Sequence, residues 1–324
     1  MIPSRVCRAW RHRAGPALVF ALLAFSSGCD RIRRALNDEA AASAGDPVWQ
    51  SDSTMLATNP NILFRVFNHA NGRAVAPIAT FGTQGFRQVT MGGRGWRAFD
   101  LNYLQAGHTL RAVRDGLDAG EVRLTRGMWE QGAQLDTLRW CGRPVPAGLV
   151  NAPSGVTLAI AGERPALKRV APLSAGELQE ALSTIPTLIA PSSGISTSML
   201  ARYTREVRVL ATGAGPRPSI LVIYNDPEQV SDTLKSMAQR PRQFIVVLDK
   251  GVYGFRPTFT FATLGNALSE PRMAFLDYVD VDGNGKAELF FTFLANKKYE
   301  VTSALRFENE VWREVLRQLV RCEG

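Results

Sequence analysis

The sequence predicts a mainly β protein of the α+β type, with antiparallel sheets and a few helices. Short stretches that alternate between apolar and polar residues recur along most of the chain, as they do in strands. Turn signals such as Asn71-Gly72 and Asp115-Gly116 separate neighbouring stretches. Only two stretches show helical spacing. The connections between the later strands are short, and short connections favour antiparallel pairing.

The first half of the chain predicts strands and hairpins. One hairpin turns at Asn71-Gly72, and a second carries Asp115-Gly116 and Gly120 in its turn. The expected strands lie within residues 61–82, 95–104, 108–129 and 154–163.

A helix is expected next, from Ser174. Glu177 follows Ser174 at the spacing of a capping box, and leucine and isoleucine then recur at helical spacing. Pro186 is expected to end or kink this helix. The stretch 191–198 is rich in serine and glycine and is the best internal domain boundary.

The second half again predicts strands, with one helical insertion over residues 226–239. The strand–helix–strand order around it is compatible with a parallel crossover, but the short later connections favour a mainly antiparallel half, either propeller-like or a sandwich. The expected strands are 205–212, 219–224, 243–248, 257–264, 272–279, 287–294, 299–307 and 311–315.

Composition and charge place the chain among globular proteins and argue against nucleic-acid binding. The 324 residues are 45% hydrophobic and 21% charged, which suits one large or two medium domains. Removing residues 1–28, which hold four arginines and no acid, lowers the formal charge from +9 to +5. The remaining arginines are scattered, so a codon bias explains them better than a nucleic-acid surface.

The N-terminus predicts export. A basic start is followed by an apolar run from Ala17 to Phe25, far shorter than the roughly 20 residues of a membrane span. The sequence "FSSGC" that follows resembles a bacterial lipobox. The resemblance implies that residues 1–28 are a lipoprotein signal peptide and that Cys29 is acylated, which would anchor the protein to a membrane of the cell envelope on its periplasmic or outer side. The alternative is an ordinary secretory signal.

If the protein is exported, the two cysteines that remain in the mature chain besides Cys29 lie in an oxidising compartment, and residues 1–28 are absent from the mature chain. Cys141 and Cys322 remain as a pair in an oxidising compartment and predict a disulfide, with two unrelated thiols as the alternative. The expected parts of the mature chain are a polar tether (29–58), an N-terminal β-rich domain that ends in a helix (59–190), and a C-terminal β-rich domain (199–324).

The stretch "DVDGNGKAEL" at 280–289 carries the one candidate site. Calcium favours several oxygen ligands on a flexible loop. Alternate residues offer such oxygens: the side chains of Asp280, Asp282, Asn284 and Glu288 and the backbone carbonyl of Lys286. A catalytic role for a carboxylate and a metal-free turn are the alternatives. Against the metal-free turn, crowded acidic groups repel one another unless a cation is present.

This stretch resembles the calcium loops of FG-GAP and VCBS-type repeats, which lie in β-hairpins. The resemblance covers one hairpin and implies that the five residues named above are calcium ligands. An EF-hand requires a glutamate at the twelfth position, where this chain has Phe291, so the sequence does not favour that loop type.

No catalytic signature appears, including nucleophile elbows, zinc motifs and phosphate loops. We therefore expect a non-catalytic binding or structural module of the cell envelope, with an envelope glycan or protein as partner and with calcium as cofactor. The rival interpretations are an envelope hydrolase that acts on glycan or peptide, and a two-lobed ligand-binding protein.

Overall fold

The computed structural model describes residues 61–69, 72–82, 85–88, 99–127, 139–140, 143–144, 147–162, 171–193, 196–226, 241–264, 272–295 and 299–322. Every described residue lies in one compact unit, Ser51–Gly324. This part is mainly β, with antiparallel pairing in all its sheets and two α-helices, which confirms the predicted fold class.

The elements of the first half are β1 (Asn61–His69), β2 (Gly72–Gly82), β3 (Gly85–Gln88), a short π-helix η1 (Asp100–Leu104), β4 (Thr109–Arg114), β5 (Leu117–Arg126), β6 (Arg139–Trp140), β7 (Arg143–Pro144), β8 (Gly148–Asn151) and β9 (Leu158–Ala161). Those of the second half are α4 (Ala175–Ser193), α5 (Thr197–Leu200), β10 (Thr204–Leu210), β11 (Ser219–Asn225), β12 (Pro241–Gly251), β13 (Gly254–Leu264), β14 (Ala274–Val279), β15 (Glu288–Ala295), β16 (Tyr299–Glu308) and β17 (Val311–Cys322).

The first sheet is ring-like. Its strands follow the order β1-β9-β4-β5-β8-β2-β3, and β2 also pairs with β1, so six strands close on themselves. The predicted hairpins β1–β2 and β4–β5 are both present. The second turns at Asp115 and Gly116, whose φ values of 53° and 71° match a tight hairpin turn. Gly120 lies within β5 and not in the turn.

The prediction of a strand over 95–104 is wrong for its described residues, because Asp100–Leu104 form a helical turn. Phe99 and Leu104 are buried inside the ring, whereas Leu101 is exposed. Asp100 is buried as well, so the buried residues lie four and five positions before Leu104, which is a helical spacing. Burial of this helical face overrides the alternation of apolar and polar residues seen in the sequence.

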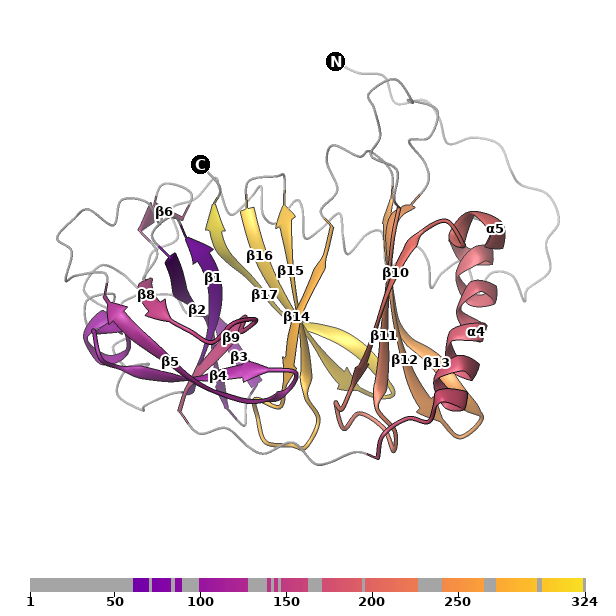
Figure 1. The fold of residues 1–324 in the computed structure, drawn as a ribbon, viewed down its shortest axis with the longest axis horizontal. Coiled ribbons are helices and arrows are strands. Elements are labelled where there is room, and N and C mark those ends of the chain that lie inside the picture. Colours follow the sequence, from indigo (N-terminus) through magenta and orange to yellow (C-terminus); the bar gives the residue numbers. More distant parts are fainter. Residues whose placement is uncertain are drawn as a thin grey trace, which may run out of the picture. The chain divides into compact units, whose positions relative to one another are not determined.

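Two four-stranded sheets make up the second half, in the orders β10-β11-β12-β13 and β14-β15-β16-β17. Each strand pairs with its neighbours in sequence (Figure 1). The β11–β12 pair is antiparallel, so the order around residues 227–240 is not a parallel crossover. Those residues, which hold most of the helix expected there, lie outside the described residues.

The expected capping box at the start of α4 is confirmed. The Ser174 hydroxyl accepts a hydrogen bond from the Glu177 backbone N–H at 3.2 Å, and the Glu177 carboxylate accepts one from the Ser174 backbone N–H at 3.0 Å. The helix continues past Pro186 to Ser193, so Pro186 does not end it, and the alternative that Pro186 kinks the helix stays a prediction. Burial of Ala181 and Ile185 against the β10–β13 sheet stabilises this helix and outweighs the loss of one backbone hydrogen bond.

Alternate residues of the central strands pack into different layers, because successive strand side chains point to opposite faces. Ile220 and Val222 of β11 pack toward α4, whereas Leu221 and Ile223 pack against the β14–β17 sheet. The far face of the β14–β17 sheet packs on the ring through a second cluster that includes Phe290. Figure 1 shows α4 and α5 beside the β10–β13 sheet.

Candidate cation-binding hairpin

The candidate loop lies where the sequence places it, between two antiparallel strands. Val279 at the end of β14 pairs with Glu288 at the start of β15. The loop between them contains Gly283 and Gly285, whose φ values of 77° and 83° fall in the left-handed region. Strands on both sides match the hairpin setting that the FG-GAP and VCBS resemblance implies, and differ from the helices of an EF-hand.

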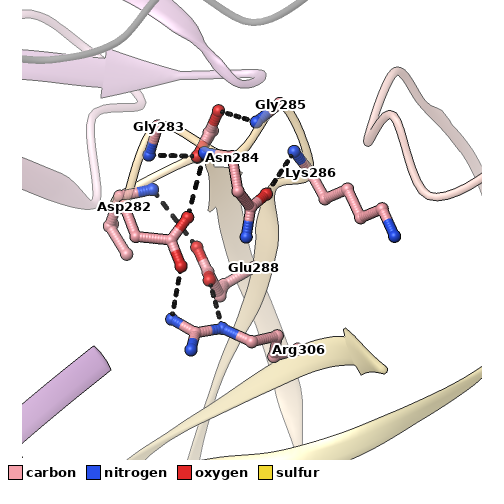
Figure 2. A network of polar contacts seen from close by, with 9 residues as sticks. Asp282, Gly283, Asn284, Gly285, Lys286, Glu288 and Arg306 are labelled. Atoms are coloured by element: carbon pink, nitrogen blue, oxygen red, sulfur yellow. Dashed lines mark hydrogen bonds and ion pairs between the residues drawn. The ribbon is translucent and has the colours of Figure 1, made fainter. Parts of the chain in front are cut away.

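Three of the predicted ligands fold the loop onto itself. The Asp280 carboxylate accepts hydrogen bonds from the backbone N–H groups of Gly283 and Gly285, both at 2.8 Å. Asp282 accepts one from Asn284 at 3.1 Å, and Asn284 accepts one from Lys286 at 2.7 Å (Figure 2). Burial raises the pKa of Asp280. These side chains supply the turn with local acceptors of the kind that aspartate and asparagine favour.

Glu288, the fourth side-chain ligand expected, faces an arginine. Its carboxylate is fully buried. It accepts one hydrogen bond from the Val281 backbone N–H at 3.2 Å and another from Arg306 Nε at 2.7 Å. The Arg306 guanidinium also reaches the Asp282 carboxylate, at 3.2 Å (Figure 2). Burial raises the pKa of Glu288 to about 7, and the charge and hydrogen bond of Arg306 oppose that rise.

Arg306 is a residue of the candidate site that the sequence did not reveal. The β15–β16 register pairs Leu289 with Leu305, which places Arg306 beside Glu288 on the neighbouring strand. Its guanidinium carbon also lies 5.4 Å from the centre of the Phe86 ring on β3. The sequence does show a basic residue, Arg306, near the end of the apolar stretch 301–307. It does not show that Glu288 is the partner of Arg306, because that depends on how β15 and β16 are aligned.

The predicted ligands fit calcium in chemical kind, and a competing cation is already present. A carboxylate oxygen has two lone pairs, so accepting one N–H leaves capacity for a metal ion. In the described ranges, no group of three or more His, Cys, Asp or Glu side chains converges closely enough to hold a metal ion. Calcium in this loop would therefore compete with Arg306 for the carboxylates of Asp282 and Glu288.

The loop also contacts the neighbouring sheet. The Ala287 backbone N–H donates to the Thr212 carbonyl at 2.7 Å, and a Cβ atom added at Gly213 would lie 2.1 Å from the Gly285 carbonyl oxygen. Gly213, with a φ of 72°, therefore permits the close approach of the two turns. The loop of the β14–β17 sheet thus contacts the β10–β11 turn directly, and Arg306, which holds its carboxylates, packs on Phe86 of β3.

A second buried polar cluster does not form an active site. Asp249 accepts hydrogen bonds from Ser219 at 2.5 Å and from Trp312 Nε1 at 2.8 Å, and Thr258 contacts the same carboxylate. Asp249 and Ser219 are 3% and 0% exposed, so no substrate reaches them in this conformation. This network joins the two four-stranded sheets through Trp312 of β17.

The remaining sequence-predicted sites stay predictions. Cys29, the tether and Cys141 lie outside the described residues. The short strand β6, which immediately precedes Cys141, contacts β17, the strand that ends at Cys322. In the part of the chain that the structure describes, no helix is long and apolar enough to cross a membrane.

Comparisons with known proteins give no relatives: no family model, curated protein or solved structure matches this chain.

Proposed function

We propose that this protein is an exported, lipid-anchored, non-catalytic binding or structural module of the cell envelope, and that calcium stabilises its 280–288 hairpin. The observation that carries the proposal is the position of this loop. Its backbone bonds to the β10–β11 turn at Thr212, and its Asp282 and Glu288 carboxylates face Arg306, which packs on Phe86 of β3. An ion held there would stabilise the hairpin and its contact with the β10–β11 turn.

The proposed ligands are the side chains of Asp280, Asp282, Asn284 and Glu288 and the carbonyl of Lys286. Calcium accepts six to eight oxygen ligands in a flexible arrangement, so it tolerates oxygens that also accept backbone hydrogen bonds. It would supply positive charge to the carboxylates that Arg306 now contacts. The proposed role is structural, because the side chains that would hold the ion also accept the backbone hydrogen bonds that form the turn.

Thermal and chemical unfolding of the mature chain test the calcium site. Calcium at 100 times its dissociation constant should add about 2.7 kcal/mol to the free energy of unfolding measured in EDTA. Asp282→Asn keeps the acceptor for the Asn284 N–H and removes the charge, so it should abolish most of the increment. Glu121→Gln, an exposed acid on β5, is the matched control and should keep it. An equal calcium response in all three proteins rejects the site.

Mass spectrometry of the mature N-terminus tests the anchor. The expected product begins at an acylated Cys29 and fractionates with membranes. Cys29→Ser should release the protein into the soluble envelope fraction. An unmodified N-terminus elsewhere in the chain would show that the leader is an ordinary secretory signal.

A further inference from the structure

A cleft of about 720 Å³ opens beside the ring, away from the calcium loop. It is lined by β1 and β2, by the loop that follows β8, and by Glu300 of β16. Small-molecule sites commonly have volumes of about 300–1,000 Å³. The charged side chains among its lining residues are Arg65, Arg73 and Glu300.

Arg73 holds the loop wall of the cleft in place. Its guanidinium donates to the backbone carbonyls of Ala152 at 3.2 Å and Pro153 at 2.6 Å, and also to that of Val156. These carbonyls satisfy N–H groups but carry no formal charge. Burial lowers the pKa of Arg73, yet an arginine remains protonated in proteins. The side chain therefore brings a full positive charge to the wall of the cleft.

Arg65 contributes a second positive charge and is only 9% exposed. It donates to the Thr157 carbonyl at 3.0 Å, and its Nε lies 3.4 Å from the Glu300 carboxylate. Glu300 offsets one of the two arginine charges, so the lining residues carry a net charge of +1. An anion in the cleft would offset this remaining charge.

We propose that this cleft binds a small anion through a carboxylate or phosphate group. Guanidinium groups present planar pairs of N–H donors that match the oxygens of both groups. Arg73 and Arg65 stand on neighbouring strands, held by backbone carbonyls of one loop. Their position is thus fixed before a ligand arrives, which lowers the entropy cost of binding. This inference does not depend on the calcium site or on the lipid anchor.

The test is calorimetric titration of the mature chain with inorganic phosphate and, separately, with propionate, at 150 mM salt to screen distant charges. Saturable binding of one or both is expected, and the anion that binds identifies the group recognised. Arg73→Gln should weaken binding about tenfold or more, because it removes a charge-assisted contact. Arg114→Gln is the matched control, since Arg114 also donates to this loop, at the Ser154 carbonyl, but does not line the cleft.

Arg73→Gln could also disturb the loop after β8, so two further variants test binding independently of that loop contact. Ser154 is exposed and lines the cleft, so Ser154→Trp should fill the space and abolish binding while the protein stays folded. Glu300→Gln removes a negative charge from the lining and should tighten binding. Absence of saturable binding in the folded wild-type protein would overturn the proposal. Equal binding by wild type, Arg73→Gln and Ser154→Trp would also overturn it.

Discussion

Asp277 and Gly116 are joined by a buried hydrogen bond of 3.0 Å from the Gly116 backbone N–H to the Asp277 carboxylate. The Asp115 N–H donates to the same carboxylate at 3.1 Å. A Cβ atom at Gly116 would lie 2.3 Å from the ring of Tyr278, so only glycine fits this turn. The β4–β5 turn of the ring is thereby fixed to β14.

The first prediction concerns the charge of Asp277. Burial raises the pKa of this carboxyl above its unfolded value of 3.8. The stability that the protonated form contributes is present below pH 3.8 and is lost as the pH rises through the folded-state pKa. Asp277→Asn should therefore remove a component of the free energy of unfolding that falls with rising pH. Urea denaturation at a series of pH values measures this component.

The control for that experiment is Asp118→Asn. Asp118 is an exposed residue of β5 and accepts the Gly120 N–H within its own strand. Its substitution should leave the pH dependence of the wild-type protein in place. If Asp277→Asn also leaves it in place, burial of Asp277 does not control this pH dependence.

The second prediction concerns the contact between two turns. Gly213→Ala would place a Cβ atom against the Gly285 carbonyl at a positive φ, and we expect it to cost about 2 kcal/mol or more of stability. At Gly215 the nearest atom to an added Cβ is 3.5 Å away, so Gly215→Ala should cost much less. Guanidinium denaturation compares the two. Equal losses would refute tight docking of the hairpin loop.

The third prediction concerns Arg306. Arg306→Gln leaves the buried Glu288 without its cation and should cost about 3–5 kcal/mol, whereas the double variant with Glu288→Gln should recover much of that loss. Arg256→Gln breaks an exposed ion pair with Glu310 and should cost less than about 1 kcal/mol. If calcium binds the loop, it should restore more stability to Arg306→Gln than to the wild-type protein. Denaturant titrations with and without calcium measure both effects.

The fourth prediction concerns Cys141 and Cys322. Peptide mapping without reductant should find them in one disulfide-linked fragment. Reduction should then lower the unfolding free energy by about 2–4 kcal/mol, and Cys141→Ser should make the protein insensitive to reductant. Two free thiols in the mapped peptides would exclude the bridge.

Local features of the sequence predicted most of the strands and the start of α4. The Ser174–Glu177 capping box needs only two residues at a fixed spacing, and the hairpin at Asp115-Gly116 needs only its turn. Pairings between strands far apart in sequence, such as β1 with β9, leave no such local pattern. The ring was therefore not predicted, although all of its strands except β8 were.

In the candidate site too, the local features could be predicted from the sequence and the contacts between strands could not. The turn-forming roles of Asp280 and Asn284 follow from local chemistry, and the loop has the expected strands on both sides. Arg306 lies on another strand, and its meeting with Glu288 depends on the β15–β16 register. The cleft beside Arg73 depends on ring closure, so no spacing in the sequence could have indicated it.

The contacts of the 280–288 turn also bear on how the protein melts. The turn bonds to Thr212, and the β14–β17 sheet shares one apolar cluster with the ring and another with the β10–β13 sheet, so neither neighbour can separate from it without exposing apolar surface. The described part of the chain should thus unfold in a single cooperative step, with slow amide hydrogen exchange shared across β1, β11 and β15.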